Sequence, residues 1–274
     1  MQRRTLLQTG LALGSLSALS SCATLTSQAP AKAQVVVIGG GYGGATAAKY
    51  VRVLSNYKIS VVLIEPNKTF ISCPMSNLVL GGSKTMAQIT TPYTALSSKH
   101  GVSLVHDLVT AIDPAKKTVS LKNGGTISYD KLIVSPGVDM HFDSIEGLQA
   151  ANASGQILQA WKAGAETTAL RQQLEAMPDG GVYALTVPEA PYKCPPGPYE
   201  RASQVAHYFK QAKPKSKVLI LDANPDITSK PALFKKFWSD NYKDIIEFRP
   251  NHKVVAVDAK NQHLEIRCAR KHSC

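Results

Sequence analysis

The chain has 274 residues, 44% of them hydrophobic, which is the composition of an ordinary globular protein. Its formal net charge is +12, but the first 32 residues supply +3 of this and the last eight another +3. The sequence holds no basic stripe with interleaved aromatic residues, which argues against nucleic acid as a partner.

The first 33 residues are predicted to be an export signal. Arg3-Arg4 precedes a largely apolar run, residues 6–19, that is too short to span a membrane. Paired arginines favour the twin-arginine route, which exports proteins folded around a cofactor, over an ordinary secretory signal. Two processing sites compete: a lipoprotein-like box ending at Cys22, and the small-residue pattern Ala31-Lys32-Ala33. We expect a periplasmic protein, attached to a membrane only if Cys22 is lipidated.

Residues 34–165 are predicted to form a first domain that opens with a dinucleotide site. The apolar run Gln34–Ile38 predicts a buried parallel strand, and a glycine-rich turn and a predicted helix follow it directly. In this pattern Gly39 permits a tight turn, Gly41 lets the backbone approach a diphosphate, and Gly44 allows close packing of helix against strand.

A second apolar run, residues 59–64, predicts the next strand and ends in Glu65. This glutamate lies 21 residues after Gly44, where a carboxylate can accept hydrogen bonds from a ribose diol. Strand, glycine turn, helix and acid together predict a nucleotide site with far more specificity than the glycines alone.

Two further segments favour FAD over NAD as the nucleotide. Residues 126–137 follow a predicted β-hairpin centred on Asn123-Gly124-Gly125 and end in Pro136-Gly137. They resemble the second FAD motif of flavoproteins with two dinucleotide domains, in which this segment returns the chain beside the flavin. Cys73 follows Glu65 closely enough to lie near an isoalloxazine ring, although a lone cysteine is more often a small buried residue.

Residues 166–266 are predicted to form a second domain with βαβ geometry. The expected strands are residues 181–187 and 217–221, the latter followed by Asp222, with a helix over residues 199–210 between them. The turn after the first strand carries Cys194 and two prolines, which fix φ near about −65° and remove two backbone donors. Such a turn suits a sulfur better than a diphosphate, which argues against a pyridine-nucleotide substrate.

The helix after this turn begins with two charged residues. Glu200 and Arg201 can bias the Cys194 thiol toward the thiolate, or they can cap and flank the helix. We favour capping.

Taken in order, these motifs are similar to those of the flavoprotein subunit of flavocytochrome c sulfide dehydrogenase. The most diagnostic segments are Cys194–Ala202 and Lys213–Asp222. The resemblance implies an α/β fold with two Rossmann-like domains of the glutathione-reductase type. It also implies FAD bonded covalently through Cys73, a redox-active disulfide that includes Cys194 as the catalytic sulfur, sulfide as the substrate and a c-type cytochrome subunit as electron acceptor. The cofactor-binding residues are then Gly39, Gly41, Gly44, Glu65, Cys73, Pro136 and Gly137.

The end of the chain departs from this family. Residues 267–274 do not resemble it, and the second domain is expected to be incomplete, as after a frameshift or an early stop. The cysteine that pairs with the equivalent of Cys194 belongs to the missing part, and spacing gives Cys268 or Cys274 little support as a substitute. A truncated layer leaves strand edges and apolar faces uncovered, so we expect marginal stability for the chain alone.

Two alternatives to a cytochrome-linked enzyme stay open. A membrane sulfide:quinone oxidoreductase shares the fold and chemistry, but the context of Cys73 and the run after Cys194 favour the cytochrome-linked branch. An inactive flavin-binding fragment is suggested by the absent partner cysteine. No metal is expected, because Cys268, Cys274 and His272 are too few for a site that usually needs four ligands.

Overall fold

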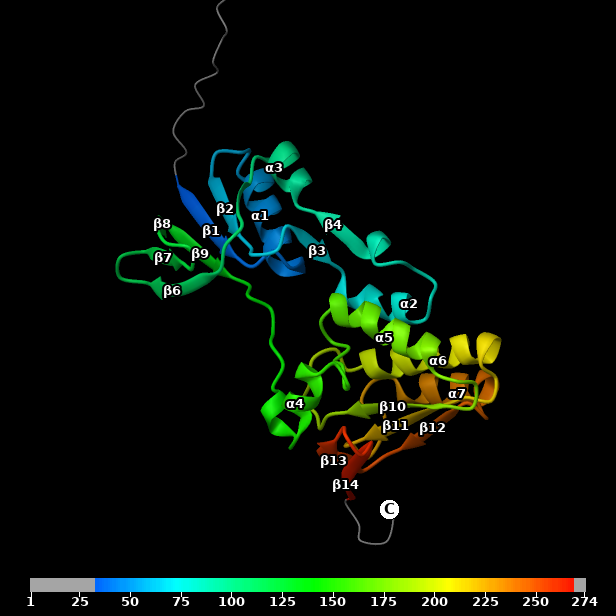
Figure 1. The fold of residues 1–274 in the computed structure, drawn as a ribbon. Helices are drawn as coiled ribbons and strands as arrows, with labels where there is room; N and C mark the ends of the chain where they lie inside the picture. The colour runs from blue at the N-terminus through cyan, green and yellow to red at the C-terminus, as the bar shows by residue number, and fades with distance from the viewer. Residues whose placement is uncertain (1–32, 269–274) are drawn as a thin grey trace, which may run out of the picture.

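The computed structural model describes residues 33–268 and confirms an α/β fold with a parallel, Rossmann-like sheet in each half of the chain (Figure 1). The predicted export signal up to residue 32, with Cys22, and residues 269–274, with Cys274, lie outside the described residues. Within residues 33–268, no helix combines the length and apolar character needed to cross a bilayer.

The first half is built on four parallel strands in the order β5-β2-β1-β9. β1 (Gln34–Ile38) lies between β2 (Ser60–Ile64) and β9 (Lys131–Val134), and β5 (Ser103–Val105) borders β2. Helix α1 (Tyr42–Leu54) connects β1 to β2. The predicted strand–helix–strand unit is thus confirmed, with a helix that begins earlier than expected, inside the glycine run.

Strand β1 is buried on both faces, as its continuous apolar run predicts. Val35 and Val37 pack with Ala48 of α1, whereas Val36 packs on the opposite face with Val119. That second face is covered by an antiparallel sheet of β6 (Val109–Asp113), β7 (Thr118–Leu121) and β8 (Thr126–Ser128). β7 and β8 form the hairpin predicted from the sequence.

Short elements stand between β2 and β5: β3 (Thr69–Ile71), η1 (Cys73–Met75), α2 (Ser76–Leu80), η2 (Ala87–Ile89), β4 (Thr90–Pro92) and α3 (Thr94–His100). Two more, η3 (Phe142–Ser144) and α4 (Leu148–Ala153), follow β9 on the way to the second half. β3 and β4 pair antiparallel on either side of the segment that carries Cys73.

The second half contains three parallel strands, β10 (Val182–Val187), β11 (Lys217–Asp222) and β12 (Ile246–Arg249). Helix α6 (Gly197–Ala212) joins β10 to β11, and α7 (Pro231–Asn241) joins β11 to β12. The predicted βαβ unit is confirmed. Helix α5 (Ala165–Ala176) precedes the sheet, and a hairpin of β13 (His252–Asp258) and β14 (His263–Cys268) follows it.

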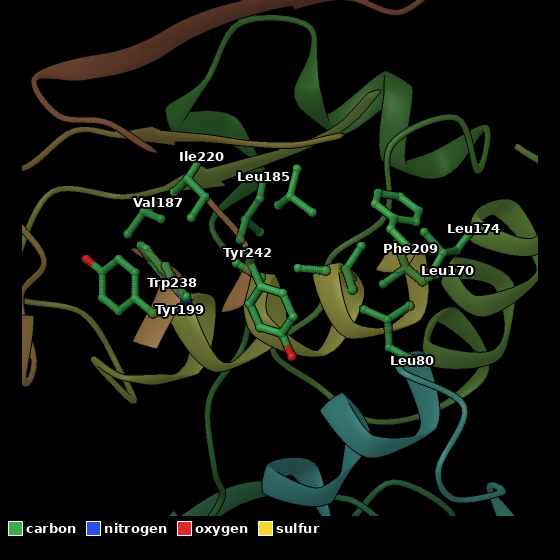
Figure 2. Close-up of a cluster of buried hydrophobic side chains, with 14 of the residues drawn as sticks. Leu80, Leu170, Leu174, Leu185, Val187, Tyr199, Phe209, Ile220, Trp238 and Tyr242 are labelled. Atoms are coloured by element: carbon green, nitrogen blue, oxygen red, sulfur yellow. The ribbon is translucent and has the colours of Figure 1, made fainter. Parts of the chain in front are cut away.

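The core of the second half also receives a helix from the first. Tyr199 and Phe209 of α6 are fully buried there, and Leu170 of α5 packs with them. Figure 2 shows Leu80, from α2, lying beside Leu170 and Phe209 in this cluster. Because α2 directly follows Cys73, this packing carries the Cys73 segment to the helices of the second half.

Candidate functional site

The predicted glycine turn joins β1, β9 and α1 with no room for side chains. Gly39 has a φ of +91°, and a Cβ there would lie 2.0 Å from the carbonyl oxygen of Ser135. A Cβ on Gly44 would lie 1.8 Å from the carbonyl oxygen of Gly39. Glycine is therefore required at both positions, as the sequence predicts.

Gly41 differs from these two because it faces open space. A Cβ at Gly41 would meet no atom within 4 Å, and α1 begins directly after it without a side-chain cap. The first backbone N–H groups of a helix have no acceptor within that helix, and its positive dipole end attracts anions. An open glycine before an uncapped helix start fits the diphosphate of a dinucleotide.

Two side chains hold the turn in shape. The Glu65 carboxylate accepts hydrogen bonds from Gly40 N at 2.7 Å and from Asn67 N at 2.9 Å and Nδ2 at 2.7 Å. Tyr93 donates to the carbonyl oxygen of Gly40 at 2.9 Å. Burial, with a smaller effect from Glu65, raises the pKa of Tyr93 to about 12, so its hydroxyl remains a donor. Sequence reasoning missed Tyr93, which no motif marks.

The other predicted flavin-binding residues follow β9. Ser135 N donates to the carbonyl oxygen of Ile38 at 2.8 Å, which brings the end of β9 beside the end of β1. Pro136 and Gly137 come next and are exposed, with Gly137 at a φ of +81°. They therefore lie at the carboxyl edge of the sheet, the edge that also carries the glycine turn. A cavity of about 350 Å³, lined partly by Gly41, opens beside that turn.

Cys73 and Cys194 both lie near Trp161, although they are 121 positions apart in the sequence. The Cys73 thiol contacts the carbonyl oxygen of Trp161. On the other side, a Cβ at Gly197 would lie 3.3 Å from the Cys194 sulfur and 3.6 Å from Cζ3 of the Trp161 ring. Trp161 thus neighbours both sulfurs, an arrangement that the sequence alone did not predict.

The loop of Cys194 is held in an uncommon conformation. Cys194 has a φ of +58° and is exposed, and its carbonyl oxygen accepts a hydrogen bond from Gly197 N at 2.9 Å. Tyr192 packs edge-on against Trp161 with ring centroids 5.8 Å apart, and its hydroxyl contacts those of Tyr199 and Thr228. These contacts hold the loop that carries Cys194.

Arg201 is a buried cation close to this pair. It is 5% exposed, donates a hydrogen bond to the carbonyl oxygen of Ala160 and lies 5.9 Å from the centre of the Trp161 ring. Burial lowers the pKa of its guanidinium, and Tyr183 and both cysteines oppose that shift. The prediction that Arg201 caps helix α6 is wrong, because α6 has no side-chain cap and the packing of Trp161 draws Arg201 inward.

Neither cysteine of the pair is oxidised. Cys73 and Cys194 are free thiols, whereas Cys268 is disulfide-bonded, so Cys268 is not the partner of Cys194. Across residues 33–268, no group of three or more His, Cys, Asp or Glu side chains is arranged to hold a metal ion.

Asp222, at the end of β11, stands where many nucleotide-binding domains place a ribose-binding acid. It is fully buried, and its carboxylate accepts hydrogen bonds from Tyr199 at 2.7 Å and from Asn224 N and Nδ2 at 2.9 and 2.8 Å. Burial raises its pKa. Asp222 is fully buried, whereas Glu65 is partly exposed, so Asp222 is a poor ribose ligand. This agrees with the interpretation of the Cys-Pro-Pro turn as unsuited to a dinucleotide.

Replacing Asp222 with asparagine is expected to change how stability depends on pH. The folded-state pKa of Asp222 lies above its ordinary value of about 3.9. Between these two values the native state holds a proton that the unfolded chain has lost, so wild-type stability falls as pH rises through this window. The measurement is urea unfolding across a pH series. The free energy of unfolding of Asp222→Asn, relative to that of the wild type, should increase as pH rises from about 4.

Asp226→Asn is the matched control, for which stability should depend on pH in the opposite direction. A hydrogen bond from Lys235 lowers the pKa of Asp226, so the wild type should lose stability relative to this variant as pH falls below about 4. Parallel pH profiles for wild type and Asp222→Asn would contradict the prediction.

Comparison with family models divides the chain into two overlapping matches. Residues 33–174 match the family described as pyridine nucleotide-disulphide oxidoreductase. Residues 167–274 match the family described as the central part of the sulfide dehydrogenase (flavocytochrome c) flavoprotein chain.

Individual relatives agree with these matches. The mitochondrial sulfide:quinone oxidoreductase of Mus musculus is 24% identical over 245 residues, which cover 85% of this chain and 50% of that protein. The sulfide dehydrogenase (flavocytochrome c) flavoprotein chain of Chlorobaculum thiosulfatiphilum is 56% identical over 46 residues, which cover 17% of this chain and 94% of that sequence.

Among solved structures, the sulfide:quinone oxidoreductase of Aquifex aeolicus has a TM-score of 0.68 at 21% identity. The match covers 86% of this chain and 57% of that one, and it concerns the fold. The chain thus spans about half the length of the mouse and Aquifex proteins.

Proposed function

The chain belongs to the pyridine nucleotide-disulphide oxidoreductase family, and from this premise we propose that it is a flavin-dependent enzyme that oxidises sulfide and passes the electrons to a c-type cytochrome. The observation that carries the proposal is that Cys73, from the flavin-binding half, and Cys194, from the second half, both lie near Trp161. Sulfide is named in the family that matches residues 167–274 and in the mouse and Chlorobaculum relatives.

FAD is the proposed cofactor, and its residues are those predicted from the sequence. The diphosphate would lie over Gly41 at the start of α1, and Glu65, held by Gly40 and Asn67, would face the ribose. Pro136 and Gly137 would border the flavin, and Cys73 would hold it through a thioether. A bound flavin supplies a two-electron acceptor, which sulfide oxidation requires.

Cys194 is proposed as the residue that accepts the sulfur. Its exposed thiol and fixed backbone present the sulfur in one direction. Hydrosulfide and the Cys194 thiol together lose two electrons as an S–S bond forms between them, which leaves a persulfide on Cys194. A bound flavin would take up the two electrons, the proton released and one proton from solvent. Arg201, a buried cation near both cysteines, favours negative charge on sulfur during this step.

The proposed electron acceptor rests on the second half of the chain. The family match over residues 167–274 and the 56% identity over 46 residues both point to the flavocytochrome c flavoprotein. Sulfide:quinone oxidoreductase is the second candidate, since the mouse enzyme matches more of the chain. We also propose export to the periplasm, the compartment that the arginine pair and apolar run of the first 33 residues favour.

The acceptor assignment can be tested by comparing two acceptors with the same purified chain. We expect sulfide-dependent reduction of cytochrome c, followed anaerobically by absorbance, to be faster than reduction of a short-chain quinone. Faster reduction of the quinone would replace the cytochrome proposal with the second candidate.

Intact mass under denaturing conditions tests covalent flavin attachment. The purified wild-type chain is expected to carry the additional mass of one FAD, because Cys73 is a half-buried thiol in the flavin-binding half. Cys73→Ser should show the bare polypeptide mass and still bind flavin when native. FAD mass on the serine variant would contradict attachment at Cys73. A chain that binds no flavin in either form would favour the inactive-fragment alternative.

A further inference from the structure

A small cavity lies between the two cysteine-bearing segments. Its volume is about 10 Å³, which is room for a ligand of one non-hydrogen atom. Helices α2, α5 and α6 and the segment before α5 enclose it, and its lining residues are Ser76, Asn77, Leu80, Ala160, Thr167, Leu170 and Arg201.

Asn77 presents this cavity with an unsatisfied acceptor. The residue is 7% exposed, and its Nδ2 donates to the carbonyl oxygen of Gly197 at 3.4 Å, which fixes the orientation of the amide. Its Oδ1 is buried and has no hydrogen-bond partner among the described residues. A buried acceptor left in this state costs about 1–3 kcal/mol, so a ligand with a hydrogen to donate is favoured here.

Arg201 presents the same cavity with an uncompensated charge. It is 5% exposed, yet across residues 33–268 no carboxylate lies within ion-pair distance of its guanidinium. Its hydrogen bond to Ala160 uses one of five N–H donors. Buried charges in proteins are normally paired, so an anionic ligand is favoured here.

We propose that Asn77 and Arg201 bind one hydrosulfide ion in this cavity. Hydrosulfide has one non-hydrogen atom and can donate its S–H to Asn77 Oδ1. Its negative charge would pair with the guanidinium of Arg201. Chloride carries a negative charge for Arg201 but has no hydrogen to donate to Asn77 Oδ1. Water can donate a hydrogen to Asn77 Oδ1 but carries no charge for Arg201. The inference rests on the proposed sulfide-oxidising function and names the residues that would hold the substrate before it reacts.

The location of the cavity agrees with this role. Ser76 Oγ donates to the carbonyl oxygen of Cys73 at 2.6 Å, which connects the cavity wall to the first cysteine. Asn77 bonds to Gly197, next to which the Cys194 sulfur lies. Residues that line the cavity therefore bond to the segments that carry Cys73 and Cys194.

Binding can be measured separately from oxidation. The probe is sodium hydrosulfide, added anaerobically to the full chain in which Cys73→Ser and Cys194→Ser remove both reactive thiols. In ¹H–¹⁵N NMR spectra the Asn77 side-chain amide and the Gly197 amide should shift saturably with hydrosulfide and not with equal sodium chloride. No shift, or equal shifts with the two salts, overturns the proposal.

Two further substitutions in this Cys73→Ser, Cys194→Ser chain identify the ligand contacts. Asn77→Asp keeps the shape but supplies Arg201 with a carboxylate, and Arg201→Gln removes the charge. Each should raise the dissociation constant for hydrosulfide at least about tenfold, because each removes one charge-assisted hydrogen bond to the ion. Asn241→Asp, the same substitution at an exposed position of α7, should leave it unchanged. Unchanged binding in Asn77→Asp or Arg201→Gln would also overturn the proposal.

The failure of this inference is distinguishable from the failure of the proposed function. Sulfide oxidation by the unsubstituted chain without hydrosulfide binding in the Cys73→Ser, Cys194→Ser chain would refute the cavity site alone. Saturable binding without any oxidation would support the cavity site and refute the proposed enzyme.

Discussion

Gly44→Ala is expected to abolish flavin binding and to lower the free energy of unfolding by roughly 3 kcal/mol or more. The new methyl group would lie 1.8 Å from the carbonyl oxygen of Gly39 and 3.3 Å from Cγ1 of Val37. The first contact is with backbone at the tight turn, which cannot move away without separating α1 from β1. Urea unfolding followed by circular dichroism measures the loss of stability, and flavin absorbance after gel filtration measures the loss of binding.

Gly41→Ala is the matched comparison three residues earlier. A methyl group at Gly41 meets no atom within 4 Å, and the backbone there is extended, with φ −65° and ψ −172°. Stability should therefore stay within about 0.5 kcal/mol of wild type. Flavin binding should nonetheless weaken, because the methyl group projects into the space proposed for the diphosphate. Equal stability losses in the two variants would contradict the difference in packing between Gly44 and Gly41.

Cys194→Ser is expected to reduce sulfide oxidation at least about a thousandfold while flavin binding stays intact. Serine matches cysteine in shape but cannot form the S–S bond on which the proposed reaction depends. Anaerobic stopped-flow spectroscopy, following flavin bleaching after sulfide is added, measures the rate directly. The flavin absorbance of the resting variant serves as the control for folding.

A neighbouring variant tests whether the sulfur atom itself matters. Lys193→Ala alters the same exposed loop and should retain most of the activity, because Lys193 contributes no sulfur chemistry. Substantial sulfide oxidation by Cys194→Ser would transfer the catalytic role to another group and end this assignment.

The local pattern of apolar residues and glycines in the sequence was enough to predict most of the parallel strands and most of the helices that join them. The β-branched runs that became β1 and β11 are apolar on both faces, which is the signature of buried parallel strands. Element ends were less predictable. Helix α6 begins at Gly197 rather than Tyr199, because Pro198 fits the first turn of a helix, where its missing N–H costs nothing.

The composition of the candidate site depended on packing that no local pattern encodes. Trp161, Asn77 and Arg201 come together only because α2 is buried against α5 and α6. Arg201 in particular follows a helix start, where capping is the usual role of a polar residue, yet tertiary contacts turn it inward. The domain boundaries and the assigned roles of the site residues remain predictions.

The position of Trp161 also gives the protein a built-in optical signal. The chain has two tryptophans, and Trp238 lies in the core of the second half, where it packs with Tyr199 and Phe248. A Trp238→Phe background therefore leaves a single indole, that of Trp161, which packs edge-on against Tyr192 in the loop of Cys194. Indole emission is quenched by nearby thiolates and by energy transfer to flavins. Cofactor loading and changes at the Cys194 sulfur can then be followed by fluorescence in real time, without a label.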